Sequence, residues 1–453
     1  MSLFLQPDVC LQIRHDGVEL YRKDVPVFHT LGIGEAFALS WLAASGDYET
    51  AAEACAECLP DGEQFVKRVV DRYWTYLGDG PARPIDLAWL EQATKTRPKF
   101  AILPMSNVKQ EAAPACITWL VTLGCNRKCP YCFFNVYHFA ADSPVGPPDA
   151  TFPLKDAVSM VHQMAQIGAA DLYLTGGEPF LRQDLTEVIE EATKARVRTH
   201  AVTKYLVSPS LAKRIATAGI TSVTVSIDDS RPKEAAALAG SPGYLAEATQ
   251  TVCNLLEAGV NTDVNTVATK VNINQLDQLA LFLADLNVKH LKVSPFHSPY
   301  PIRLSAEKLV TTVRLEDQIA DLQLKYQGRG LEIEMGGEQD PMSNVRCGSK
   351  IVCEIGTRAL DVLPDGSASR CHYLPGVSEL TVGSLRTQTI LEIWNGPHLR
   401  ALSKPERESF AGTACEPCDN HQACNSRGRC YVSALQSTGQ LHAPDAFCTR
   451  EAI

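Results

Sequence analysis

The stretch from Gly124 to Phe134, GCNRKCPYCFF, places three cysteines within eight residues. Three and then two residues separate Cys125, Cys129 and Cys132. Zinc in a structural site takes four ligands, and the common cubane iron–sulfur sites also take four cysteines. A trio of cysteines at this spacing therefore either recruits a distant ligand or leaves one metal position open.

The size and charge of the chain narrow its class. A chain of 453 residues is too long for one ordinary core and predicts about three domains. No apolar run approaches the length of a membrane span, and Asp8 and Arg14 come too early for a signal peptide, so we expect a cytoplasmic protein with no membrane partner. A net charge of -10 argues against a nucleic-acid partner, because phosphate binding needs a cationic surface.

The cysteines are unevenly distributed. There are 16 of them, and in a reducing compartment such a number indicates metal binding rather than disulfides. Besides the trio, eight fall in the C-terminal part of the chain and make two possible sets of four; they are Cys347, Cys353, Cys371, Cys415, Cys418, Cys424, Cys430 and Cys448. A zinc ribbon is the simpler alternative for the Cys-x2-Cys pair at 415 and 418 with two further cysteines.

The middle of the chain alternates strand-like and helix-like segments. The six strand-like runs are ITWLVTLG, DLYLTGGE, RTHAVTK, SVTVSID, NTDVNTVAT and HLKVSPF. Apolar residues recur at helical spacing between them, which predicts six βα repeats and a parallel sheet. Either an open, partial barrel or a doubly wound sheet satisfies this pattern. In both, ligands bind at the carboxyl ends of the strands.

Several chemically distinctive motifs follow these strands. The cysteine trio follows the first strand, TGGEP at 175–179 ends the second, Thr203 and Lys204 end the third, and SIDD at 226–229 ends the fourth. Adjacent glycines allow a backbone to approach a ligand closely, or simply form a turn. The Glu178 carboxylate is suited to accept a ligand ammonium. Ser226 and Asp228 are suited to bind ribose hydroxyls, or else cap the next helix.

Together these motifs resemble the radical S-adenosylmethionine (SAM) superfamily. The pattern Cys-x3-Cys-x-aromatic-Cys is matched by the trio with Tyr131, and the glycine motif by Gly176, Gly177, Glu178 and Pro179. The resemblance implies a [4Fe-4S] cluster on the trio, with the fourth iron left for SAM, whose reductive cleavage yields a 5'-deoxyadenosyl radical. It also implies that Glu178 and the glycines hold the SAM ammonium, that Tyr131 lies against the adenine, and that Ser226 and Asp228 contact the ribose.

The C-terminal cysteines resemble the SPASM extension of that superfamily, which carries two auxiliary [4Fe-4S] clusters. That resemblance assigns Cys347, Cys353, Cys371 and Cys430 to the first auxiliary cluster, and Cys415, Cys418, Cys424 and Cys448 to the second. Three [4Fe-4S] clusters and SAM are thus the expected cofactors. Five residues separate Cys424 from Cys430, where the family more often has three, and this departure bears on the assignment of Cys430.

The first hundred residues read as short strands followed by helices at about 34–44, 48–58 and 63–77. This layout resembles the winged-helix-like leader-recognition domain of maturation systems for ribosomally made peptides (RiPPs). Such a domain binds a leader peptide as an added strand at a sheet edge, and we expect the region Asp16 to Lys23 to form that edge. A domain that merely packs on the barrel is the alternative.

The predicted modules are a leader-recognition domain at 1–95, a linker at 96–112, a partial (βα)6 barrel at 113–310, a bridging segment at 311–342 and a SPASM domain at 343–453. The implied function is a peptide maturase that abstracts hydrogen from a precursor peptide and installs a thioether or carbon–carbon cross-link, with a flavodoxin or ferredoxin as electron donor. A formylglycine-forming sulfatase maturase and a non-catalytic electron carrier or zinc scaffold are the alternatives. His372, which directly follows Cys371, is a candidate catalytic base.

Overall fold

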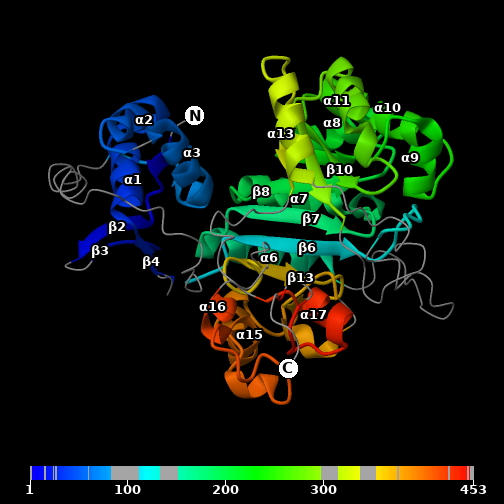
Figure 1. Cartoon of the computed structure of the whole chain (residues 1–453). Coiled ribbons are helices and arrows are strands. Elements are labelled where there is room, and N and C mark those ends of the chain that lie inside the picture. The colour runs from blue at the N-terminus through cyan, green and yellow to red at the C-terminus, as the bar shows by residue number, and fades with distance from the viewer. Residues whose placement is uncertain are drawn as a thin grey trace.

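The computed structural model describes residues 3–14, 17–23, 25, 28–59, 61–82, 112–132, 152–296, 315–336, 353–374, 377–426, 429–445 and 448. It has three parts: an N-terminal α+β domain, a central sheet flanked by helices, and a C-terminal extension (Figure 1). The predicted linker at 96–112, apart from Ala112, and the predicted ligand Cys347 lie outside the described residues.

The central sheet has ten strands in the order β12-β11-β10-β9-β8-β7-β6-β13-β14-β15. The strands from β6 to β12 are parallel and follow one another in chain order: β6 (Cys116–Thr122), β7 (Asp171–Gly176), β8 (Arg198–Thr203), β9 (Ser222–Ser226), β10 (Thr262–Ala268), β11 (His290–Pro295) and β12 (Glu332–Met335). A doubly wound sheet reverses its strand order at a switch point, and the run of strands from β6 to β12 does not. The partial barrel is therefore confirmed, and all six predicted strands are present.

Helices connect these strands. They are α6 (Leu154–Ile167), α7 (Leu185–Lys194), α8 (Pro209–Ala218), α9 (Pro232–Ala239), α10 (Tyr244–Glu257), α11 (Leu276–Asp285) and α13 (Leu315–Tyr326), with short 3-10 turns η3 (Pro179–Leu181) and η4 (Ile273–Gln275). Alternate residues of each strand join the core with these helices, as Ile117, Trp119 and Val121 of β6 do. The opposite alternation, Cys116 and Thr118, is half-buried on the other face of the sheet, as expected for a period of two.

The segment predicted as a bridge adds a further helix and strand to the barrel. Helix α13 leads into β12, which pairs in parallel with β11 from His290 opposite Glu332 to Val293 opposite Met335. Ile333 of β12 joins the central core. The described part of the bridging segment therefore belongs structurally to the barrel sheet.

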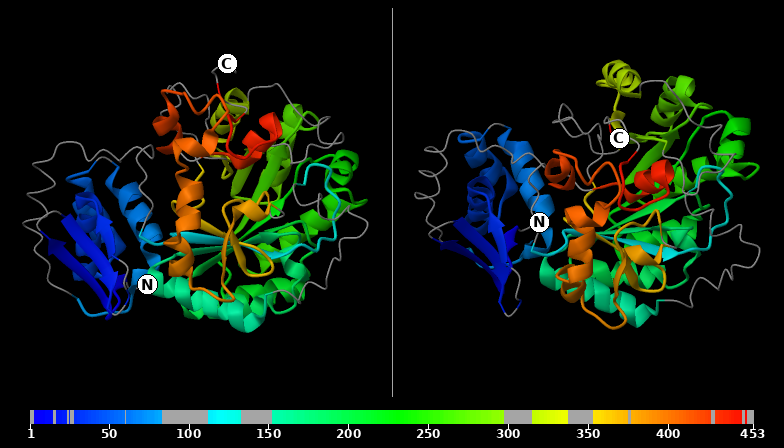
Figure 2. Two further views of the ribbon diagram at one scale, coloured as in Figure 1. Left: turned by 90° about the horizontal axis from the view of Figure 1, so that it is seen from below. Right: turned by 60° about the horizontal axis from the view of Figure 1, so that its bottom comes forward.

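The C-terminal extension continues the same sheet on its other side. It contains β13 (Ala359–Val362), β14 (Ser367–Ser369), β15 (Thr381–Ser384), α14 (Ile390–Trp394), α15 (Pro397–Ser403), α16 (His421–Ser426), α17 (Tyr431–Thr438), and the 3-10 turns η5 (Ser378–Leu380) and η6 (Arg407–Phe410). Strand β13 pairs in parallel with β6, and β14 and β15 follow antiparallel. Figure 2 shows these orange and red segments against the sheet. The strand that leads into the cysteine trio is thus flanked by the C-terminal extension.

The N-terminal domain has the predicted order of strands and then helices. A sheet of β2 (Val9–Arg14), β3 (Gly17–Arg22) and β4 (Phe28–Leu31) is followed by α1 (Ile33–Ser45), α2 (Tyr48–Ala56) and α3 (Gly62–Arg72); η1 (Trp74–Tyr76) and the paired strands β1 (Phe4–Leu5) and β5 (Leu77–Gly78) complete it. The third helix ends earlier than predicted. The helix α3 ends at Arg72. The Gln6 and Arg22 side chains donate to the Thr75 carbonyl at 2.9 and 2.6 Å, and these bonds hold the following residues in the 3-10 turn η1.

The prediction that the region from Asp16 to Lys23 forms the sheet edge is wrong. Strand β3, which spans most of that region, is the central strand and pairs with both β2 and β4. Among the described residues, the two outer strands of this sheet are β2 and β4. An added strand would have to pair with one of these two.

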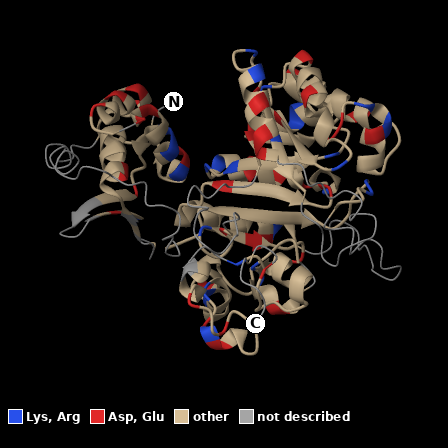
Figure 3. Ribbon diagram, in the orientation of Figure 1, with Lys and Arg blue, Asp and Glu red and all other residues tan. Residues whose placement is uncertain are grey.

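The N-terminal domain packs on the barrel at the amino ends of its strands. The Tyr76 hydroxyl donates to the Ile167 carbonyl at 3.2 Å. Arg198, at the start of β8, binds Asp71 of α3 at 2.8 Å and Asp171 at the start of β7 at 2.8 Å. Figure 3 shows that charged residues lie mainly on helices and loops, whereas most of β6 and β7 carries neither sign. The charged contacts at this base lie at the opposite end of the strands from the motifs described next.

Candidate active site

The cysteine trio lies in the loop that leaves β6 after Thr122. Cys129 is buried, and its thiol donates to the Ala239 carbonyl at 3.6 Å. The Lys128 backbone N–H also donates to Ala239 at 3.3 Å. Cys125 and Cys132 are half-buried, and the Arg127 backbone N–H donates to the Cys125 sulfur at 3.4 Å. The end of α9 thus anchors the loop, and backbone donors near a sulfur favour its anionic form.

The two glycines after β7 allow that strand end to touch the cysteine loop. The Gly177 N–H donates to the Thr122 carbonyl at 2.7 Å, and a Cβ at Gly177 would lie 2.0 Å from the Gly124 oxygen. Gly176 has a φ of +124°, which side-chain-bearing residues rarely adopt. The sequence predicted a close approach to a ligand. The close approach in the structure is to the loop that carries the cysteines.

Glu178 links the ends of two strands. Its carboxylate is buried and accepts from the Thr203 hydroxyl at 2.8 Å, the Lys204 N–H at 3.0 Å and the Phe180 N–H at 3.2 Å. Burial raises the pKa of Glu178 to about 7, against these hydrogen bonds, which lower it. Pro179 is also buried and begins η3. The contacts that the structure shows for this carboxylate are with protein donors, and its predicted contact with a SAM ammonium stays a prediction.

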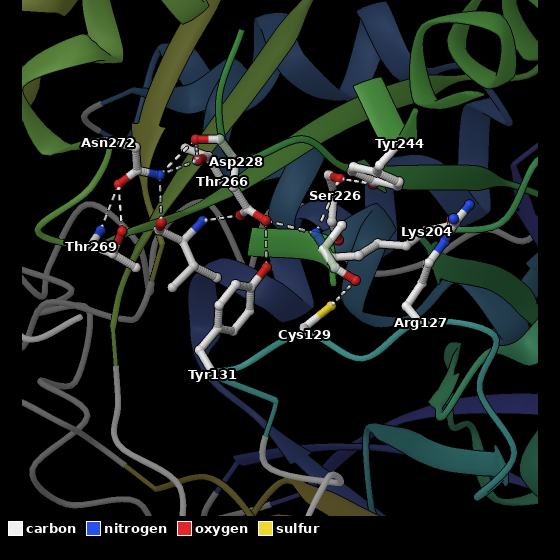
Figure 4. Close-up of polar contacts among 12 residues, drawn as sticks. Arg127, Cys129, Tyr131, Lys204, Ser226, Asp228, Tyr244, Thr266, Thr269 and Asn272 are labelled. Carbon is white, nitrogen blue, oxygen red and sulfur yellow. Dashed lines mark hydrogen bonds and ion pairs between the residues drawn. The ribbon is translucent and has the colours of Figure 1, made fainter. Parts of the chain in front are cut away.

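Asp228 is the centre of a buried polar network at the same rim (Figure 4). One carboxylate oxygen accepts from the Tyr131 hydroxyl and, at 2.7 Å, from Lys204 Nζ, and the other accepts from the Val267 N–H at 2.9 Å. The Asn272 side chain holds the Asp228 carbonyl at 2.6 Å. Burial alone would lower the pKa of Lys204, but the Asp228 charge raises it well above its usual value. The network joins the cysteine loop to three strand ends.

Ser226 contributes to the network through its backbone. Its carbonyl accepts from Lys204 Nζ at 3.3 Å and from the Tyr244 hydroxyl. The Lys204 ammonium lies 5.1 Å from the Tyr244 ring centre, and the Arg127 guanidinium lies 4.9 Å from it. Arg127 also forms an ion pair with Glu247 and donates to the Lys204 carbonyl at 3.0 Å. A ribose contact by the Ser226 side chain remains a prediction.

Sequence reasoning placed Lys204 at this rim without giving it a role, and it gave no role to Arg127. Lys204 directly follows β8, and Arg127 lies inside the cysteine motif, so both were visible at the predicted rim. Their carboxylate partners, Asp228 and Glu247, lie 24 and 120 residues away in the chain. Only the folded structure brings these pairs together.

The first predicted auxiliary set draws its described members from three segments. Cys353 precedes β13, Cys371 follows β14, and Cys430 is the N-cap of α17. Burial raises the pKa of Cys371, and the Cys353 charge raises it further. Burial also raises the pKa of Cys430, and the Cys353 charge again adds to this effect. Cys353 therefore acts electrostatically on the two other described thiols of its predicted set.

The second predicted set is arranged around Cys415. Burial raises the pKa of Cys415, the Arg429 side chain lowers it, and the charges of Cys448 and Cys418 raise it. Cys424 lies in α16. Within the described ranges, no three His, Cys, Asp or Glu side chains converge closely enough to hold a metal ion. Both sets of four therefore remain predictions.

The chemistry of the first set fits an iron–sulfur cluster. Thiolates are the protein ligands of such clusters. Beside Cys353 and Cys371 lies Arg370, which is fully buried and whose Nε and Nη2 find no hydrogen-bond partner among the described residues. A buried cation with unpartnered donors fits an anionic group at this place.

His372 and Asp361 form a pair near these cysteines. The His372 ring Nδ1 lies 2.8 Å from an Asp361 carboxylate oxygen, and the His372 N–H donates to the same oxygen at 2.9 Å. Asp361 is buried on β13, in register with Thr118 of β6, whereas the His372 side chain is 20% exposed. The imidazole is thus held at one nitrogen by a buried carboxylate. This is an arrangement that orients a base.

Comparisons with known protein families agree with this arrangement. A model described as the Radical SAM superfamily matches residues 119–283, and one described as an iron–sulfur cluster-binding domain, SPASM, matches residues 353–424. The chain is a radical SAM enzyme with a SPASM domain. Iron–sulfur clusters and SAM are accordingly its cofactors.

Curated relatives of this radical SAM enzyme differ in their activities. An AdoMet-dependent heme synthase of Nitratidesulfovibrio vulgaris is 23% identical over 363 residues, which cover 75% of this chain and 94% of that protein. A PqqA peptide cyclase of Methylocella silvestris is 24% identical over 338 residues, covering 72% and 85%. Mycofactocin maturase MftC of Mycobacterium ulcerans is 24% identical over 343 residues, covering 75% and 88%.

Solved structures with the same fold also differ in how much of the chain they cover. SuiB of Streptococcus suis, crystallised with its precursor peptide SuiA, has a TM-score of 0.63 at 16% identity and covers 99% of this chain and 100% of its own. The structure of anSMEcpe with bound AdoMet and Cp18Cys peptide has a TM-score of 0.54 at 16% identity and covers 74% of this chain and 94% of its own.

The described part of the chain contains no helix long and apolar enough to cross a membrane.

Proposed function

We propose that this radical SAM enzyme matures a ribosomally made precursor peptide by abstracting a hydrogen atom and closing an intramolecular thioether or carbon–carbon cross-link. The observation that carries the proposal is the N-terminal α+β domain in front of the barrel. SuiB, whose structure includes a bound precursor peptide, matches the fold over 99% of the chain, which includes this domain. Two relatives, a PqqA peptide cyclase and a mycofactocin maturase, add support for a peptide substrate.

The proposal assigns three [4Fe-4S] clusters to the eleven predicted cysteine ligands. Cys125, Cys129 and Cys132 hold the cluster that binds SAM. The first auxiliary cluster takes Cys347, Cys353, Cys371 and Cys430, and the second takes Cys415, Cys418, Cys424 and Cys448. With SAM bound, the cluster on Cys125, Cys129 and Cys132 would supply the radical chemistry for hydrogen abstraction. The protein positions the reactants and excludes water.

Residues at the rim of the barrel contact one another and so fix the geometry of the proposed SAM site. The backbone of Gly176 and Gly177 lies against the cysteine loop, and Glu178 and Pro179 fix the turn after β7. Asp228 binds the Tyr131 hydroxyl, so the aromatic ring of the cysteine motif is oriented before SAM arrives. Ser226 presents its carbonyl to Lys204 beside it. In this proposal Tyr131 contacts the adenine and Ser226 and Asp228 contact the ribose.

His372 serves as the base that removes the proton lost on bond closure. Its contact with the buried Asp361 supports this role, because a carboxylate at Nδ1 orients the imidazole and stabilises the imidazolium that forms when the ring accepts a proton. Replacing His372 with Gln should lower cross-linked product while 5'-deoxyadenosine formation continues. Chromatography of both products checks this. Equal loss of both would assign His372 to the SAM site instead.

The proposed partners are the precursor peptide, bound through its leader, and a flavodoxin or ferredoxin that supplies electrons. The leader adds to an outer strand of the N-terminal sheet, β2 or β4, in place of the region first predicted. The domain division proposed from the sequence is kept, with β12 added to the barrel. A formylglycine-forming sulfatase maturase has no need of a leader-recognition domain, and an electron carrier has no need of an open iron position. Both therefore rank lower.

The mass of the product tests the cross-link. One hydrogen atom is abstracted, and closing the bond then releases one proton, which His372 would take up, and one electron, for which the auxiliary clusters would be the acceptor. Each cross-link should lower the precursor mass by about 2 Da when peptide, SAM and reductant are incubated with the enzyme. Precursor lacking its leader is the control and should react much more slowly. An unchanged mass despite 5'-deoxyadenosine formation would exclude cross-linking.

A further inference from the structure

Arg370 is a buried cation with an incomplete set of partners. It follows Ser369, the last residue of β14, and its side chain is fully buried. Its Nη1 donates to the Cys353 sulfur at 3.0 Å, whereas Nε and Nη2 have no partner in the described part of the chain. It forms no ion pair with a carboxylate of the described residues, although an unpaired buried charge is costly. The placement therefore requires a source of negative charge close by.

The surroundings of Arg370 fix the guanidinium beside the sulfurs. The Arg370 N–H donates to the Leu380 carbonyl at 2.8 Å. The guanidinium lies 5.6 Å from the centre of the Tyr431 ring, whose hydroxyl donates to the Leu402 carbonyl at 2.6 Å. An arginine guanidinium keeps its proton in proteins. The cation is thus permanent, and its contacts are with sulfur and an aromatic ring.

We propose that Arg370 is the counter-ion of the auxiliary cluster at Cys353, Cys371 and Cys430, and that its charge raises the reduction potential of that cluster. The inference rests on the proposed function, which assigns a cluster to these cysteines. A cluster held by thiolates is anionic and gains another negative charge on reduction. A fixed cation with a hydrogen bond to a ligand sulfur stabilises the reduced form more than the oxidised form. The electron released on bond closure is then accepted more readily here.

Arg429 provides a matched control at the other auxiliary set. Its Nη1 lies 3.6 Å from the Cys415 sulfur, its Nε donates to Asn425 at 2.6 Å, and its guanidinium lies 4.1 Å from the centre of the Phe410 ring. It is half-buried rather than fully buried. A charge that reaches solvent and is farther from sulfur has a weaker effect on a cluster.

The test is a redox titration of the anaerobically purified full-length enzyme, followed by electron paramagnetic resonance. Replacing Cys371 with Ala should remove the first auxiliary cluster, and the signal that is lost identifies it. Arg370→Gln should shift the first signal to lower potential, with about a tenfold change in its reduction equilibrium, or about 59 mV for one electron. Arg370→Lys, which keeps the charge, should shift it much less, and Arg429→Gln should leave it in place.

Each outcome decides the proposal. Loss of this cluster in Arg370→Gln with its retention in Arg370→Lys would also support the counter-ion role. An unchanged potential in Arg370→Gln, or loss of the cluster in both variants alike, would overturn it. If the wild-type enzyme itself has no auxiliary cluster that depends on Cys371, the cofactor assignment fails instead, and iron analysis of Cys371→Ala identifies that case.

Discussion

The buried cations at the rim of the barrel have different kinds of partner from the buried cation in the C-terminal extension. At the rim, Lys204 has Asp228 at 2.7 Å, and Arg127 has Glu247. In the extension, Arg370 contacts a cysteine sulfur and no carboxylate of the described residues. The rim cations are thus neutralised by adjacent carboxylates. The positive charge of Arg370, in contrast, acts on the cysteine sulfur. In our proposal this difference suits a strongly reducing SAM cluster and an electron-accepting auxiliary cluster.

Removing the rim thiols should have the largest effect. Replacing Cys125, Cys129 and Cys132 with Ala should abolish reductive cleavage of SAM, because no other proposed cluster has an open iron. Iron should fall from about twelve to about eight per chain, since the auxiliary clusters do not share these ligands. Cys253→Ala on α10, outside the predicted sets, is the control and should change neither quantity. Continued 5'-deoxyadenosine formation by the triple variant would disprove the assignment.

Removing the carboxylate that neutralises one rim cation should have the next largest effect, which is on stability. Asp228→Asn leaves the Lys204 ammonium buried without its counter-ion, and loss of one partner of a buried pair costs about 3–5 kcal/mol. Lys204→Met added to Asp228→Asn should restore part of that stability. Denaturant unfolding of the single and double variants measures the coupling.

An exposed ion pair supplies the control for that measurement. Lys325 and Asp277 lie 2.6 Å apart with about half of each side chain exposed. Asp277→Asn should therefore cost less than about 1 kcal/mol. A loss in Asp228→Asn as small as this would mean that the rim cation is not compensated as the structure indicates.

The local pattern of the chain was enough to predict the six βα repeats and a parallel sheet, whereas the choice of a partial barrel over a doubly wound sheet came from the family resemblance. Strand-like runs and helical spacing located β6 to β11, and the order of strands and motifs along the chain put the cysteine loop and the glycine motif at one rim. Strand β12 was missed because its four residues, EIEM, give a weak signal. The pairing of β13 with β6 joins residues such as Ala359 and Cys116, and no local pattern encodes so distant a partner.

The site was predicted in its residue types but not in its connections. Tyr131, Glu178 and Asp228 were chosen as SAM contacts, yet the structure shows that each also binds neighbouring protein groups. Arg370 is adjacent to Cys371 in the sequence, but its complete burial depends on packing against Tyr431 and could not be foreseen. Sequence spacing therefore predicts which groups meet a cofactor better than it predicts which groups hold them in place.

A buried histidine, His29, is the group for which we predict the smallest effect. His29 is buried where the N-terminal domain meets the barrel, and its Nε2 lies 2.9 Å from the Tyr76 hydroxyl. Burial, with the charge of Arg72, lowers the pKa of His29 from 6.5 to about 4. Here the cost of a buried charge is avoided by keeping the ring neutral.

The lowered pKa predicts loss of stability in acid. Between pH 6.5 and about 4 the unfolded chain binds a proton at His29 that the folded chain does not, so this contribution is complete above pH 6.5 and declines as the pH falls through that window. The total is roughly 3 kcal/mol. The His29→Gln variant keeps every other titrating group of the wild type. The difference in free energy of unfolding between the two proteins, measured by thermal unfolding, should therefore shrink between pH 7.5 and 5.5. A difference that is independent of pH would mean that His29 does not change its protonation on unfolding, and hence that burial does not keep it neutral.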